Sequence, residues 1–186
     1  IEDIVVSDNN LFVGGRGAFF SSDNGANWTE VETGLTSSSI RSLGVHGSTV
    51  LAGTGSGPFR TTDNGVNWAP ISDGMVGSAA WSTFAHGSMV YAGTFANGLF
   101  RSDNSGATWL PSESGLTSQS ILSLTTHGAR VIAGSNDLGV FVSEDGGVTW
   151  DARSSGFADS CVTGLATIGE YLYASTMNAG VYRSTD

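Results

Sequence analysis

One eight-residue motif recurs along this chain at an almost constant spacing. It has the pattern Ser-x-Asp-x-Gly-x-Thr-Trp, with some exchange of Thr for Ser and of Asn for Thr, and we call it the box. Complete copies occupy residues 21–28, 61–68, 102–109 and 143–150, and the sequence stops three residues into a fifth copy, at 184–186. The aspartate position falls at 23, 63, 104, 145 and 186, at intervals of 40, 41, 41 and 41 residues. This period predicts a repeat protein, and four-stranded propeller blades have about this length.

Each box has the sequence of a hairpin turn stabilised by its own side chains. Asn-Gly, Asp-Gly and Gly-Gly pairs supply the positive φ angles that two-residue hairpin turns need. The aspartate can accept hydrogen bonds from N–H groups of the turn, and the tryptophan opens the next strand and can bury its ring between repeats. Asn104 keeps the acceptor oxygen without the charge, so its box should be weaker. The positions predicted to be structural are Asp23, Trp28, Asp63, Trp68, Asn104, Trp109, Asp145, Trp150 and Asp186.

The boxes resemble those of the Asp-box family, also called bacterial neuraminidase repeats (BNR), and the resemblance covers essentially the whole chain. Such repeats occur in the propellers of sialidases, xyloglucan-active glycoside hydrolases, sortilin-type receptors and photosystem II assembly factors. In that family the box is a structural turn that lies away from the active face. The resemblance therefore implies a fold and says little about activity.

Short apolar runs punctuated by glycine fill the segments between boxes, as in sheet propellers. One of these runs occurs five times, at 11–14, 50–53, 90–93, 131–134 and 172–175. After each box a glycine and a large apolar residue mark the crossover to the next blade; these pairs are Gly34-Leu35, Gly74-Met75, Gly115-Leu116 and Gly156-Phe157. We predict one all-β domain over residues 1–186, a β-propeller of about five four-stranded blades with the last incomplete. Its repeat units are 1–39, 40–79, 80–120, 121–161 and 162–186; a longer chain with six to eight blades is the alternative.

The composition excludes several classes of partner. The formal net charge is −10, and all seven basic residues are arginines. Nucleic acid and anionic membranes both require a basic patch, so neither is expected. No apolar run approaches the ~20 residues of a membrane span. Cys161 is the single cysteine, which precludes an internal disulfide. We expect an extracellular or periplasmic protein.

Two sets of repeated side chains could suggest chemistry. His46, His86 and His127 share the turn after the first strand, but inner strands of adjacent blades are usually too far apart for one metal ion, so we predict neither a metal nor a cofactor. Arg60, Arg101 and Arg183 share the position before the box and are expected to be structural or solvated, pairing with a neighbouring acid. A sialidase needs several arginines converging on a carboxylate. The remaining arginines, Arg16, Arg41, Arg130 and Arg153, lie on different strands and loops, and no Tyr-Glu nucleophile pair is visible.

Two further groups are candidates on the face opposite the boxes. A two-carboxylate glycosidase needs paired acids across a cleft; Asp137 and Asp159 are the best pair there, with Asp73 and Glu113 as further acids. An aromatic platform beside amides would suit a sugar. The residues proposed to bind a ligand are Trp81, Phe95, Asn97, Asp137 and Asn178, with Met177 in an equivalent loop. The alternatives are that the acids are solvated and that the apolar residues fill gaps between blades.

The function that these patterns favour is a non-enzymatic binding or assembly module. It would present the loops opposite the boxes to a glycan or a protein. The alternative is a carbohydrate-active enzyme, a glycoside hydrolase or sialidase-like protein, or a fragment of one. A purely structural segment of a larger secreted protein is the third possibility.

Overall fold

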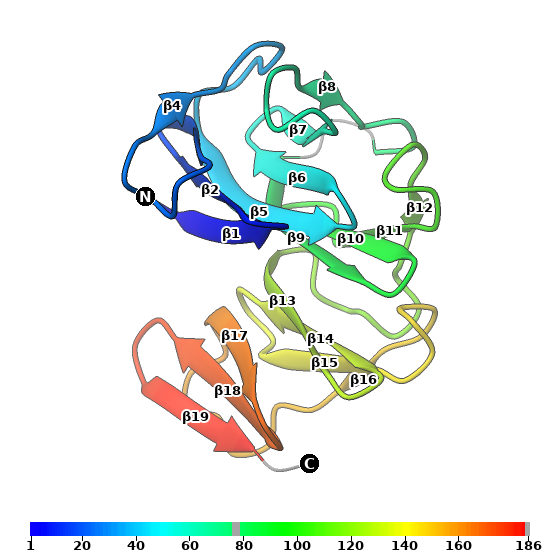
Figure 1. Ribbon diagram of the computed structural model, residues 1–186. Helices are drawn as coiled ribbons and strands as arrows, with labels where there is room; N and C mark the ends of the chain where they lie inside the picture. Colours follow the sequence, from blue (N-terminus) through cyan, green and yellow to red (C-terminus); the bar gives the residue numbers. More distant parts are fainter. Residues whose placement is uncertain (76–78, 185–186) are drawn as a thin grey trace. The chain divides into compact units, whose positions relative to one another are not determined.

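The computed structural model describes residues 1–75 and 79–184, which form nineteen β-strands in five antiparallel sheets and, over that range, no helix (Figure 1). The first sheet consists of β1 (Asp3–Ser7), β2 (Asn10–Gly15), β3 (Gly17–Ser21) and β4 (Thr29–Glu30). The second consists of β5 (Ile40–His46), β6 (Thr49–Thr54), β7 (Gly57–Thr61) and β8 (Ala69–Pro70). The third consists of β9 (Ala80–His86), β10 (Met89–Thr94), β11 (Leu99–Ser102) and β12 (Leu110–Pro111).

The fourth sheet consists of β13 (Ile121–His127), β14 (Arg130–Ser135), β15 (Val140–Ser143) and β16 (Asp151–Ala152). The fifth has three strands, β17 (Val162–Ile168), β18 (Tyr171–Thr176) and β19 (Gly180–Ser184). Strands follow one another in chain order within every sheet, so each sheet is a meander. The predicted all-β architecture with five blades is confirmed.

The second strand of a repeat is the most buried. In β6 and β14 every residue after the first is buried, because both faces of the strand are covered. Small residues make this close packing feasible. A Cβ atom added to Gly53 of β6 would lie 2.9 Å from the carbonyl oxygen of Ala80 in the next sheet, so a larger residue would push the two strands apart.

The chain divides into two compact units, which are described separately. Unit 1 comprises residues 1–92 and 101–110, and unit 2 comprises residues 93–100 and 111–186. Unit 1 has an apolar cluster between its first two sheets, formed by Phe12, Ala18, Ile40, Leu43, Val50, Ala52, Phe59 and Trp68. Unit 2 has the corresponding cluster between its last two sheets, formed by Ile132, Val140, Val162, Leu172 and Ala174.

The box of the first repeat forms a tight turn inside a longer connection. Asn24 and Gly25 have φ angles of 58° and 85°, and Ala26 N donates a hydrogen bond to Asp23 O. The expected two-residue hairpin is wrong, since residues 22–28 separate β3 from β4. Likewise, β8 begins at Ala69, one residue after the tryptophan that was expected to open it.

The carboxylate of the box is held by donors from its own turn. Asp23 accepts hydrogen bonds from Asn27 N at 2.9 Å, Asn27 Nδ2 at 2.7 Å and Ser21 Oγ at 2.8 Å. These bonds, the Asn27 side chain first, lower the pKa of Asp23 to about 2, because they favour the ionised form. Asn104 accepts from Thr108 N at 2.9 Å in the same way. Asp186 lies outside the described residues.

Three of the four complete boxes bury their tryptophan. Trp68, Trp109 and Trp150 are 4%, 2% and 3% exposed, whereas Trp28, in the first repeat, is 41% exposed. Each buried ring therefore seals a contact between two consecutive repeats of the same unit.

Candidate binding loops of unit 2

Five loops of unit 2 lie at the strand ends opposite the box turns. They span residues 95–98, 117–120, 136–139, 158–161 and 177–179, and we call them the loop series. Backbone hydrogen bonds join each loop to the next: Gly98 N to Gln119 O (2.8 Å), Asn136 N to Ser120 O (2.9 Å), Gly139 N to Ser160 O (2.9 Å) and Met177 N to Cys161 O (3.1 Å). The loop series is thus a connected surface rather than a set of independent loops.

Asp159 anchors the last two loops of the series. Its carboxylate accepts hydrogen bonds from Cys161 N at 3.0 Å and from Asn178 N at 2.7 Å. These two backbone donors, Cys161 first, lower the pKa of Asp159 below its usual range. A glycosidase proton donor requires a raised pKa, so Asp159 has the opposite property from the acid of such a pair.

Asp137 also accepts a hydrogen bond from a neighbouring loop. Ser118 Oγ donates a hydrogen bond to Asp137 Oδ1 at 2.6 Å and so ties two loops together. Between the two acids, the thiol of Cys161 lies 3.5 Å from Asn136 Oδ1. Burial, followed by the negative charges of Asp159 and Asp137, raises the pKa of Cys161. The thiol is therefore protonated at neutral pH and is not activated as a nucleophile.

Apolar side chains project from three loops of the series. Phe95, Leu138 and Met177 are 48%, 42% and 63% exposed, so none of them is packed inside a gap between sheets. Asn97, Asp137 and Asn178 belong to the same three loops. Leu138 was missed by the sequence analysis, although its position is equivalent to that of Asn97 in the preceding repeat.

Trp81 belongs to unit 1, whereas the other four residues proposed to bind a ligand belong to unit 2. It lies on β9, and the guanidinium of Arg41 stacks over its ring at 4.1 Å. Asp73 is also in unit 1, and its carbonyl accepts a hydrogen bond from Trp109 N.

His46 and Arg60, one from each repeated set, make contacts with the neighbouring repeat. His46 lies in β5, and its ring nitrogens contact Ser105 Oγ at 3.1 Å and Gly87 O at 3.2 Å. Arg60 donates to the carbonyl of Ser105 rather than to an acid, at 3.1 Å. Over residues 1–75 and 79–184, no three His, Cys, Asp or Glu side chains are grouped so that they could hold a metal ion.

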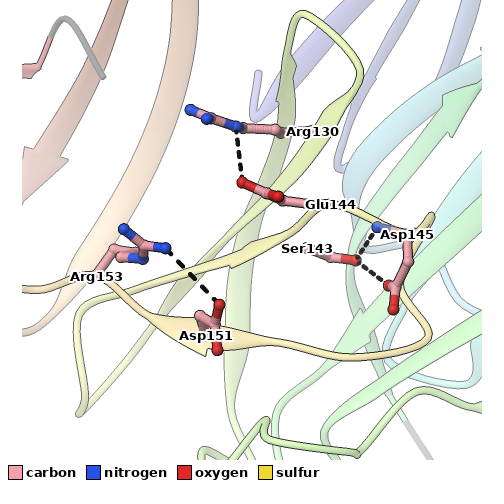
Figure 2. A network of polar contacts seen from close by, with 6 residues as sticks. All are labelled: Arg130, Ser143, Glu144, Asp145, Asp151 and Arg153. Carbon is pink, nitrogen blue, oxygen red and sulfur yellow. Dashed lines mark hydrogen bonds and ion pairs between the residues drawn. The ribbon is translucent and has the colours of Figure 1, made fainter.

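Two ion pairs join residues of the fourth repeat, within unit 2. Arg130 Nε is 3.3 Å from Glu144 Oε1, and Arg153 Nη2 is 3.7 Å from Asp151 Oδ2 (Figure 2). All four side chains are at least 44% exposed, so water screens both pairs and each contributes little to stability.

Comparison with known proteins places the chain by its fold. No protein-family model and no curated protein sequence matches it. The extracellular domain of a one-component system from B. thetaiotaomicron superposes with a TM-score of 0.80 and 17% identity, over 98% of this chain and 26% of that one. An ancestral GH74 enzyme superposes with a TM-score of 0.79 and 20% identity, over 98% of this chain and 29% of that one. YCF48 bound to D1 peptide superposes with a TM-score of 0.70 and 18% identity, over 97% of this chain and 62% of that one.

These likenesses show a β-propeller fold and nothing finer, because every identity is low. The chain spans between about a quarter and two thirds of the length of these three structures. They include both a GH74 enzyme and the extracellular domain of a one-component system, so the fold alone does not select a function. In the described residues, no helix is long and apolar enough to cross a membrane.

Proposed function

We propose that this chain is a non-enzymatic binding module whose loop series takes a protein partner. The observation that carries the proposal is the exposure of Phe95, Leu138 and Met177 on loops that backbone hydrogen bonds hold together. A pre-organised surface with apolar anchors and a polar rim is typical of protein recognition. A glycan site would instead use aromatic platforms, and the loop series has Phe95 as its one aromatic side chain.

The acids of the loop series support binding over hydrolysis. Asp137 and Asp159 each accept hydrogen bonds that connect neighbouring loops. A lowered pKa also makes Asp159 a weak proton donor. We assign both carboxylates to loop positioning, and the glycoside hydrolase alternative has no specific observation in its favour.

We infer further properties of this module. The hydrogen bonds of the box carboxylates support assigning the repeats to the Asp-box type. An extracellular or periplasmic location is compatible with the extracellular domain among the structural neighbours.

The YCF48 neighbour was solved with a bound peptide, which supports a polypeptide as the kind of partner. The charge of −10 makes nucleic acid an unfavourable ligand.

The test compares two variants on a peptide array and a glycan array. The loop variant combines Leu138→Ser with Met177→Ser. The matched control is Val148→Ser, which removes a side chain of similar exposure, 45%, from the box side of the same unit. We expect the wild type and the control to retain peptides rich in apolar residues, and the loop variant to lose them by about tenfold or more.

Three outcomes would contradict the proposal. Equal peptide binding by both variants would exclude the loop series as the site. Binding on the glycan array that Phe95→Ala removes, without peptide binding, would identify a sugar site instead. Hydrolysis of xyloglucan or of chromogenic glycosides that Asp137→Asn abolishes would establish an enzyme.

A further inference from the structure

A β-bulge displaces one residue at the start of the first strand in the second, fourth and fifth sheets. In β5 the register against β6 shifts between Ile40 and Ser42, which leaves Arg41 without an opposite residue. The corresponding shifts in β13 and β17 fall at Leu122 and Thr163. A bulge turns its extra side chain out of the regular alternation, and bulges are common beside binding sites. Arg41 is the charged residue among these three.

Arg41 is held in position by an aromatic ring. Its guanidinium carbon lies 4.1 Å from the centroid of the Trp81 ring, which belongs to β9 of the next sheet. The ring quadrupole attracts the cation, and a planar guanidinium that stacks on an indole keeps N–H groups for other partners. Ordering a flexible side chain before a ligand arrives reduces the entropic cost of binding. The stack therefore pre-organises Arg41 for an anion.

Neither Arg41 nor Arg16 has an ionic partner within the described part of the chain. Both ion pairs found there lie in unit 2, and the guanidinium groups of these two exposed arginines donate no hydrogen bond in it. The carboxylate of Asp3 is engaged by the backbone instead, since Oδ2 accepts a hydrogen bond from Leu43 N at 2.7 Å. Acidic residues outnumber arginines by 17 to seven, yet these two cations remain available to a carboxylate of another molecule.

Arg16 and Arg41 are linked through one short connection. Arg16 forms an isolated antiparallel bridge with Ser39, two residues before Arg41. Next to this bridge, Gly17 N donates to Ser38 O at 2.7 Å. These contacts join the turn between β2 and β3 to the connection that leads into β5. We call the surface so formed the arginine face; it consists of Arg16, Arg41, Trp81 and residues 36–39.

An acidic polypeptide segment fits the arginine face best. Arginine binds carboxylates through charge-assisted and often bidentate hydrogen bonds, and arginine and tryptophan are enriched among the residues that dominate protein–protein binding energy. Thr36, Ser38 and Ser39 are exposed and add hydroxyl groups that can bond a peptide backbone. A saccharide fits less well, because Arg41 covers a face of the Trp81 ring on which a sugar would stack.

We propose that the arginine face binds an acidic segment of another polypeptide, in which one carboxylate pairs with Arg41 and a second with Arg16. Trp81 is a positioning residue here, since it contacts the guanidinium and not the carboxylate. Because the whole chain carries −10, the two cations act at short range, and salt should weaken the binding by screening them. All residues of the arginine face belong to unit 1, so the inference is independent of the function proposed for the loop series.

The probe is a panel of rhodamine-labelled synthetic peptides that carry two glutamates at increasing separation among glycines and serines. Each peptide has a matched control in which glutamine replaces both glutamates. Fluorescence anisotropy with the 186-residue chain at low ionic strength should show saturable binding of at least one acidic peptide. Its amide control should bind at least about tenfold more weakly, because it cannot form the charge-assisted pairs.

Charge-removing variants locate the site. Arg41→Gln and Arg16→Gln should each weaken binding of the acidic peptide by about five- to tenfold or more. The matched control is Arg153→Gln, which removes the same charge from an exposed arginine of unit 2 and should change binding by less than about twofold. All three side chains are on the surface, and equal melting temperatures would show that the variants are folded.

A double-mutant cycle tests the role of Trp81. Trp81→Leu should weaken binding of the acidic peptide by about two- to fivefold, because the guanidinium loses its stacking partner. Trp81→Phe keeps an aromatic face and should restore most of the affinity. In the Arg41→Gln background, Trp81→Leu should cause no further loss, since the ring acts through the arginine. A purely structural role of the ring would lower affinity equally in both backgrounds.

The following results would overturn the proposal. The acidic peptides and their amide controls could bind equally or not at all. Arg41→Gln could weaken binding no more than Arg153→Gln does. Binding of an oligogalacturonate that Arg41→Gln removes, without peptide binding, would identify a saccharide site instead. A dimer of the chain in analytical ultracentrifugation that Arg41→Gln abolishes would show that a second copy, and not a separate acidic segment, occupies the arginine face.

Discussion

Replacing the buried Trp68 and the exposed Trp28 by alanine should have clearly different costs. Both residues hold the same position in a box, and both lie in unit 1, so they are compared in the same unfolding transition. Trp68 is 4% exposed and Trp28 is 41% exposed. On an indole surface of about 200 Å², this difference is about 75 Å² of buried area. At about 25 cal/mol per Å² it corresponds to about 2 kcal/mol.

The hydrogen bond from Trp68 Nε1 to Val31 O adds to this difference. A net contribution of about 1 kcal/mol is typical for such a bond. We therefore expect Trp68→Ala to cost about 3–5 kcal/mol in free energy of unfolding, as buried tryptophans usually do. Trp28→Ala should cost about 3 kcal/mol less.

Urea denaturation followed by far-ultraviolet circular dichroism measures both values, because this signal does not depend on the tryptophan removed. The m-value should stay constant, so that the shift of the midpoint reports stability alone. Equal costs for the two substitutions would refute the reasoning, since they would mean that packing of Trp68 against the preceding repeat contributes nothing and that the tryptophan acts within its own turn.

Three further perturbations test the boxes and the crossover glycines. Because the pKa of Asp23 is lowered, its contribution to stability is complete above the unfolded pKa near 4 and is lost as the pH falls toward about 2. Asp23→Asn should therefore flatten the fall of Tm over this pH range. An unchanged profile of Tm against pH would contradict the hydrogen-bond account. Asn104→Asp should raise Tm by about 1–3 °C in a thermal melt at pH 7, because a charged acceptor binds the same donors more strongly; a lower Tm would show that Asn104 is the better acceptor. Gly115→Ala should lower the free energy of unfolding in urea by at least about 2 kcal/mol more than Gly156→Ala does. Both glycines have positive φ angles, but of the two only Gly115 would place a Cβ atom against the carbonyl of Trp150. Equal losses of stability would assign the effect to the φ angle alone.

The repeated sheets could be predicted because their information is local. The spacing of Asp23, Asp63 and Asp145 sets the length of the repeat, and short apolar runs separated by glycine indicate strands whatever their surroundings. The structure shows five sheets in chain order accordingly. The turn itself was predicted less well. The box places a tight turn inside a seven-residue connection between strands, and hydrogen bonds made by side chains stabilise that connection.

The candidate site could be predicted only in part. Phe95, Asp137 and Asn178 were identified because equivalent loops could be aligned between repeats, and all three belong to loops of the connected series. Trp81 looked equally suitable in the sequence, but Arg41 of the preceding repeat covers its ring. Aligning repeats does not show which side chain of one repeat stacks on another, because that depends on the packing between sheets.

The sequence by itself determined the repeat, the strands and the positions of the boxes, because these depend on patterns within some forty residues. Only the tertiary structure decided how deeply each copy of the box tryptophan is buried. Trp68 and Trp28 are the same residue in the same motif, yet one is buried and the other is 41% exposed. Burial is a property of neighbours that lie far away in the sequence, so identical motifs acquire different roles when the chain folds.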